Sequence, residues 1–61
     1  MRRFMLKKNA KLNKASWLDR KTVYEGELIS MTARTVRLFA PDPTEKKPHV
    51  DLSYDWVTPV R

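Results

Sequence analysis

Residues 23–31 read Val-Tyr-Glu-Gly-Glu-Leu-Ile-Ser-Met and predict the strand around which the fold is built. Tyr24 and Leu28 flank Gly26 on one face of an imperfect alternation of period two, which is typical of a strand. Gly26 is the single glycine of the chain. Inside a strand, glycine marks a bulge, a sharp bend or the close approach of another backbone. We therefore expect a long strand that bends at Gly26 and serves both halves of a curled sheet.

Two further segments, residues 35–40 and 50–57, predict strands on the same grounds. In residues 50–57, one face of the strand is apolar and consists of Val50, Leu52, Tyr54 and Trp56. The residues between them, which include two aspartates, lie on the other face. Residues 41–48 contain three prolines and predict an exposed loop between these strands. Residues 15–18 and 58–61 are expected to add a short first strand and a short edge strand. The total is four or five antiparallel strands, and a small barrel is the natural way to remove their open edges.

The N-terminal segment, residues 1–16, contains no proline or glycine and predicts an amphipathic basic helix. Met5 and Leu12 would share one face of this helix, while Lys7 and Lys14 would lie on the other. The expected organisation is therefore a basic N-terminal helix or arm at residues 1–16, followed by a small β-barrel at residues 17–61. The fold class is mostly β.

Positive charge is concentrated at the N-terminal end of the chain. Residues 1–21 carry eight Lys or Arg and one Asp, eight minus one or +7, whereas residues 22–61 carry five Lys or Arg and six acids, or −1. Such an asymmetry favours a polyanionic partner. The candidate nucleic-acid-binding residues are the cations of the arm, two later arginines and one aromatic residue that would stack on a base: Arg2, Arg3, Lys7, Lys8, Lys11, Lys14, Arg20, Lys21, Arg34, Arg37 and Phe39.

Each of these candidates also has a structural interpretation. The arm could be a solvated tail, or could meet an acidic protein surface. Arg34 and Arg37 could instead pair with local acids such as Glu25 or Glu27 on the adjacent strand. Phe39 shares a strand face with Arg37 and could equally belong to a subunit interface.

Length and composition bound the remaining function classes. A chain of 61 residues makes one domain at most and buries only about 60% of its unfolded surface. It has no Cys, so neither disulfides nor thiolate metal sites can form, and its apolar runs are far shorter than the roughly 20 residues of a membrane span. We expect a cytoplasmic protein without metal, cofactor or membrane partner.

No arrangement of residues predicts catalysis. His49 is the only histidine and follows Pro48 at the end of a loop. The serines have no His or Asp at a spacing that indicates a nucleophile, and there is no glycine-rich phosphate loop. The sequence therefore predicts a binding protein and not an enzyme.

Residues 18–28, Leu-Asp-Arg-Lys-Thr-Val-Tyr-Glu-Gly-Glu-Leu, resemble the first motif of the Sm-like family, and within it the Hfq branch. There a turn precedes a strand with a central glycine. Residues 57–61, Val-Thr-Pro-Val-Arg, are similar to the closing strand of that family. The resemblance covers about 40 residues and implies a small barrel that binds RNA and assembles into a homo-oligomer; the same geometry is shared by SH3-like domains. The family's RNA-binding Tyr-Lys-His signature is replaced here by Tyr-Asp-Trp at residues 54–56, and the carboxylate of Asp55 would repel phosphate.

These observations favour nucleic-acid binding as the function, with RNA as the preferred ligand and single-stranded DNA as the alternative ligand. The alternative is a protein-interaction module, such as a modulator of the type encoded by phages or mobile elements, that docks on an acidic surface of a larger enzyme. In that case Phe39 or Trp17 would be the anchor.

Overall fold

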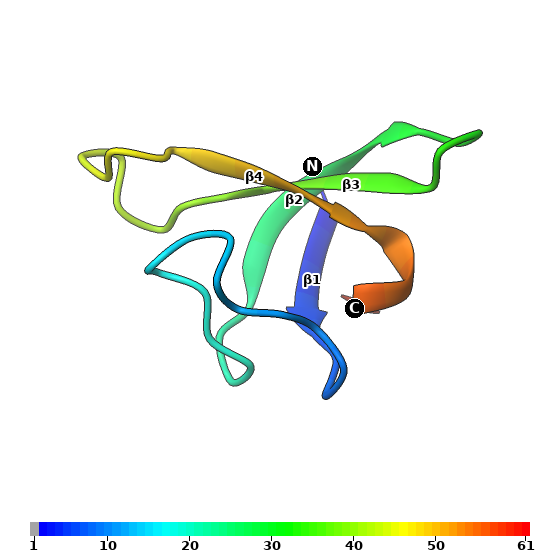
Figure 1. Ribbon diagram of the computed structural model, residues 1–61, viewed down its shortest axis with the longest axis horizontal. Helices are drawn as coiled ribbons and strands as arrows, with labels where there is room; N and C mark the ends of the chain where they lie inside the picture. The colour runs from blue at the N-terminus through cyan, green and yellow to red at the C-terminus, as the bar shows by residue number, and fades with distance from the viewer. Residues whose placement is uncertain (1) are drawn as a thin grey trace.

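The computed structural model describes residues 2–61 and contains one five-stranded antiparallel sheet with the strand order β4-β3-β2-β1-β5 (Figure 1). A single turn of 3-10 helix, η1, precedes the last strand. The two edge strands, β4 and β5, are not paired with each other, so the sheet is not closed into a barrel. The bounds of the elements are β1 Arg2–Leu6, β2 Tyr24–Ser30, β3 Thr35–Phe39, β4 His49–Ser53, η1 Tyr54–Trp56 and β5 Val57–Val60.

The expected N-terminal helix is wrong. Residues 2–6 form β1, which pairs with β2 on one side and with β5 on the other. Phe4 and Leu6 are buried and alternate with less buried neighbours, which is a period of two. An isolated helix of this length is marginal in water, whereas β1 gains hydrogen bonds on both sides and buries two large side chains. Met1 lies outside the described residues.

The expected strand at residues 15–18 is also wrong. Residues 7–23 form a long loop built from successive turns, and this loop covers one face of the sheet (Figure 1). The other face of the sheet is open to solvent. Ala10, Ala15 and Leu18 in this loop are buried in the core. The loop thus supplies apolar cover that a closed barrel would obtain from its own strands.

Of the three alternatives for Gly26, the structure shows the close approach of another backbone, and the irregularity in the pairing of β2 with β3 lies further on, between Leu28 and Ser30. A Cβ atom at this position would lie 2.5 Å from the carbonyl oxygen of Arg37 on β3, and 3.2 Å from the Phe4 ring on β1. No side chain fits such a gap without displacing backbone. Because β1, β2 and β3 meet closely at Gly26, the sheet can curl over its own core.

The third expected strand, residues 50–57, is interrupted. β4 ends at Ser53, whose Oγ accepts a hydrogen bond from the backbone N–H of Asp55 at 3.2 Å and caps the first turn of η1. The turn redirects the chain, so that Val57 begins a strand paired with β1 instead of extending β4. Tyr54 and Trp56 are consequently half-buried and pack against the edge of the core.

One hydrophobic core lies between the curled sheet and the long loop. No buried side-chain nitrogen or oxygen within residues 2–61 lacks a hydrogen-bond partner. Val36 and Leu38 on β3 are fully shielded from solvent. The buried apolar residues are Phe4, Leu6, Ala10, Ala15, Leu18, Tyr24, Val36, Leu38, Val50, Leu52 and Val57.

We expect Gly26→Ala to lower the free energy of unfolding by about 1–3 kcal/mol, because the added methyl group overpacks a junction bounded by backbone. Glu27→Ala, one residue further on the same strand and exposed, should change it by less than about 0.5 kcal/mol. Urea denaturation of both variants measures the difference. Equal stability of the two would show that the junction can relax.

Candidate nucleic-acid interface

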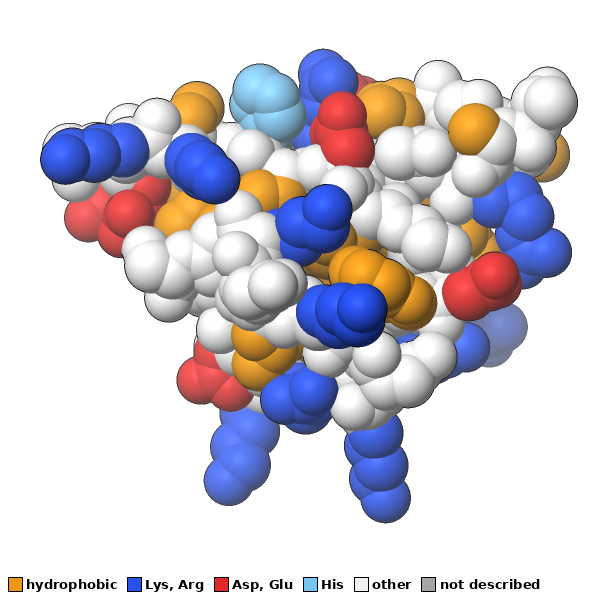
Figure 2. Space-filling model, in the orientation of Figure 1, with side chains coloured by type: hydrophobic (Ala, Val, Ile, Leu, Met, Phe, Trp, Pro, Cys, Tyr) orange, Lys and Arg blue, Asp and Glu red, His pale blue; other side chains and the backbone are white. Residues whose placement is uncertain are grey.

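The long loop concentrates the exposed cations of the chain. Residues 7–21 hold six Lys or Arg and one Asp, six minus one or +5, and all six cationic side chains are exposed. Within the described residues none of them takes part in an ion pair. Figure 2 shows several blue side chains at the centre and lower edge of this face, while red ones lie mainly at its periphery. The cations are Lys7, Lys8, Lys11, Lys14, Arg20 and Lys21.

Arg20 differs from the loop lysines because its guanidinium already has partners. Its Nη2 donates hydrogen bonds to the carbonyl oxygens of Lys8 and Ala10, at 3.1 and 2.7 Å. The planar guanidinium presents several donors in a fixed geometry, and here it joins the two ends of the loop. The role of Arg20 is therefore mainly structural: it holds the loop backbone from which the lysines project.

Tyr24 anchors the same loop to the sheet. Its ring is fully buried, and its hydroxyl donates a hydrogen bond of 2.7 Å to the carbonyl oxygen of Trp17. At the start of the loop, the backbone N–H of Lys7 donates to the carbonyl oxygen of Trp56 at 2.8 Å. The loop is thus held at its beginning, middle and end, and its ammonium groups project from a defined backbone.

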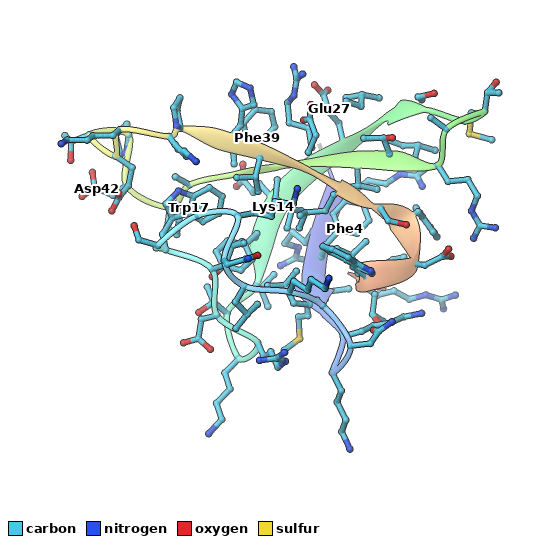
Figure 3. The ribbon with its side chains drawn as sticks, in the orientation of Figure 1. Phe4, Lys14, Trp17, Glu27, Phe39 and Asp42 are labelled. Carbon is cyan, nitrogen blue, oxygen red and sulfur yellow. The ribbon has the colours of Figure 1, made fainter. Side chains whose placement is uncertain are left out.

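The solvent-facing side of the sheet is unfavourable for phosphate. Glu27, Arg37 and Asp51 are direct cross-strand neighbours on β2, β3 and β4. Arg37 Nε donates a hydrogen bond to the Asp51 carboxylate at 2.9 Å. This bond raises the pKa of Arg37 and lowers the pKa of Asp51. The arginine is therefore committed to a carboxylate and has a second acid beside it, and Figure 3 shows Glu27 and Lys14 on opposite sides of the sheet.

Phe39 lies at the end of this solvent-facing side and is half-buried. Its ring meets the imidazole of His49 edge to face, with centroids 6.5 Å apart. The hollow that Phe39 borders is lined by residues 23–25 and 40–41, which include no lysine. The structure therefore does not bring Phe39 together with the lysines, although the sequence placed all of them in one candidate site.

Three candidate arginines, Arg2, Arg3 and Arg34, lie at or near the start of β1, away from its end at the long loop, and form a separate group. Arg2 and Arg34 border a hollow of about 510 Å³ together with Tyr54. Arg34 has a positive φ of 52°, pairs with Asp55 at 2.7 Å, and its guanidinium carbon lies 5.9 Å from the centre of the Tyr54 ring. Arg3 is exposed on β1 opposite Glu25. These arginines sit one strand length from Lys7, so they do not extend the lysine surface directly.

A cleft of about 480 Å³ opens between residues 13–17 of the long loop and residues 44–47 of the loop that joins β3 to β4. The indole N–H of Trp17 donates to the carbonyl oxygen of Lys47 at 2.8 Å, and Lys47 Nζ donates to the carbonyl oxygen of Lys14 at 3.4 Å. These two bonds cross between the loops and hold the cleft in shape.

Sequence reasoning missed Lys46 and Lys47 as site residues, and it named Trp17 only as an anchor for a protein partner. The two lysines belong to the proline-containing loop, and only the folded chain brings them next to the N-terminal segment. Their adjacency at residues 46–47 was the one signal in the sequence. Within residues 2–61, no group of three or more His, Cys, Asp or Glu is placed to hold a metal ion, and no helix has the length and apolar character needed to cross a bilayer.

The chain matches no protein-family model, no curated protein and no solved structure.

We expect Arg20→Ala to lower the free energy of unfolding by about 1–2 kcal/mol, since it leaves two loop carbonyls without their charged donor. Lys21→Ala removes the same charge from the adjacent, unpaired position and should stay within about 0.5 kcal/mol of the parent. Thermal unfolding at matched salt compares them. Equal destabilisation by the two substitutions would mean that Arg20 contributes only its charge.

We expect the carboxyl of Asp51 to titrate below the usual Asp pKa of about 3.9, and Arg37→Gln to move that pKa back towards it. A depressed pKa in the folded state contributes stability that is present above the unfolded pKa and disappears as the pH falls through the folded one. NMR titration of the carboxyl carbon measures both proteins. An unshifted pKa in the parent would contradict the pairing.

Proposed function

We propose that this protein binds single-stranded nucleic acid through the lysines of the long loop. The proposal is carried by one observation: five exposed ammonium groups project from an anchored loop and take part in no ion pair within the described residues. Phosphates that contact such groups displace condensed counterions, which is the main source of affinity in sequence-independent binding. The lysines are Lys7, Lys8, Lys11, Lys14 and Lys21.

A single strand suits this surface better than a duplex. Within residues 2–61 the only helical element is η1, a single 3-10 turn, so no described helix could enter a major groove. Flexible single strands follow a curved line of cations, and exposed aromatic rings add stacking with the bases. The Trp17 ring lies beside Lys14 at one end of the lysine surface. RNA is the preferred ligand, and single-stranded DNA is the alternative ligand.

We also propose that the sheet is an open member of the small-barrel architectures that include Sm-like and SH3-like domains. In its favour are the strand order β4-β3-β2-β1-β5, the glycine at the centre of β2 and the closing strand with Pro59. The helix that the Sm-like resemblance implies is absent from residues 2–61. A six- or seven-membered ring in solution, measured as mass by light scattering, would support the Sm-like relationship, and a monomer would contradict it.

The binding test replaces two loop lysines and follows salt dependence. We expect the Lys11→Gln, Lys14→Gln double variant to bind a fluorescent uridine oligonucleotide more weakly than the parent. The slope of log affinity against log salt should become shallower by about 0.7 for each phosphate that the variant no longer neutralises. Fluorescence anisotropy measured from about 50 to about 200 mM salt, a range in which this effect is large, provides both quantities.

The matched control removes the same net charge elsewhere. Arg34→Gln with Arg37→Gln eliminates two arginines that are already paired with Asp55 and Asp51. This variant should keep nearly the parental affinity and slope. An equal reduction of affinity in both double variants would show that the charge acts diffusely and would contradict a loop site. Equally tight binding of poly-glutamate would instead favour an acidic protein partner.

A further inference from the structure

We propose that the cleft beside Trp17 is a nucleotide subsite, in which one base stacks on the indole ring while its flanking phosphates contact lysines from two loops. This inference rests on the proposed function and deepens it, because it assigns the base of the bound strand to a named position. The cleft volume of about 480 Å³ falls within the range of about 300–1,000 Å³ that is usual for small-molecule sites.

The indole ring is fixed in place before any ligand arrives. Its N–H is held by the Lys47 carbonyl oxygen at 2.8 Å. The Tyr24 ring packs against it with centroids 5.5 Å apart and planes inclined by 58°. Trp17 is only half-buried, and part of its surface lines the cleft. A ring held in this way loses little conformational freedom when a base stacks on it, which favours binding.

The charges that border the cleft match a nucleotide. Lys14, Lys46 and Lys47 face one acid, Glu45, so the lining carries three minus one, or +2. An ammonium group has three donors. Lys47 Nζ uses one of them for the Lys14 carbonyl oxygen at 3.4 Å. It therefore retains donors for a phosphate while keeping the two loops together.

An aromatic surface next to cations is the arrangement that single-strand binders use, because every base has a stacking face and every linkage has a phosphate. The hollow bordered by Arg2, Arg34 and Tyr54 also combines these groups. There, however, the Arg34 guanidinium is paired with Asp55 and lies over the Tyr54 ring. The aromatic ring and its cation are thus already engaged with each other, whereas the lysines of the Trp17 cleft form no ion pair within residues 2–61.

The experiment uses the fluorescence of Trp17 as the reporter. The chain has two tryptophans, Trp17 and Trp56, so the full-length Trp56→Phe protein reports on Trp17 alone. We expect a uridine oligonucleotide to quench this emission as it binds, whereas inorganic polyphosphate should bind the lysines without quenching. The converse variant, Trp17→Leu, retains Trp56 and should show no quenching. Its affinity for the oligonucleotide should fall on the order of tenfold, as expected when one base no longer stacks on an aromatic ring.

The outcomes separate the subsite from the general function. Oligonucleotide binding by anisotropy without a change at Trp17 would overturn the subsite and leave the proposed function intact. Equal quenching by polyphosphate would also overturn it, because the cleft would then respond to phosphate alone. The absence of any oligonucleotide binding would overturn both. Should Trp17→Leu fail to fold, Lys46→Gln with Lys47→Gln in the Trp56→Phe protein provides the second test, and it should reduce quenching at a given oligonucleotide concentration.

Discussion

The long loop, residues 7–23, is anchored across an open sheet, and this packing governs both the core and the surface charge of the protein. A five-stranded sheet that does not close leaves an apolar face to be covered, and residues 7–23 cover it with Ala10, Ala15 and Leu18. An irregular segment packed against a core must still satisfy its backbone carbonyls. Arg20 and Tyr24 do this with hydrogen bonds of 2.7–3.1 Å. The fold of the sheet and the shape of the loop are therefore stabilised together.

The same packing separates charge on the molecule. The small and apolar residues of the loop are buried in the core, and its lysines are exposed to solvent. Figure 3 shows Lys14 on the opposite side of the sheet from Glu27, which is in register with Arg37 and, through it, with Asp51. The acids of the sheet are partly neutralised by Arg37, a pairing on an exposed surface that contributes little to stability. A polyanion that approaches the protein meets a basic loop on one side and a mixed surface on the other. This separation, more than the net charge of +6, supports the proposed binding face.

The expectations that failed have a common physical cause. The alternation of buried residues in β1 spans only five residues, Arg2–Leu6, and the same residues also fit one face of a helix. The sequence cannot show that β2 and β5 both offer unpaired edges to this segment. Similarly, the alternation in residues 50–57 continues through a turn, because Tyr54 and Trp56 pack against the core from η1 as well as they would from a strand. In both cases a tertiary contact selects between two local structures.

Residue types and local periodicity were enough to predict that the protein is mostly β, that Gly26 marks a bulge, a bend or a close backbone approach, and that a proline-containing loop joins two antiparallel strands. They also showed that the cations are concentrated before residue 22. These features depend on residue type and on local period, both of which are visible in the sequence. Only the folded chain shows that the N-terminal segment is a strand, that Arg20 holds the loop, and that Lys46 and Lys47 lie beside Trp17. Each of these depends on which distant segments become neighbours, and that is set by the packing of the whole core and not by any single stretch of residues.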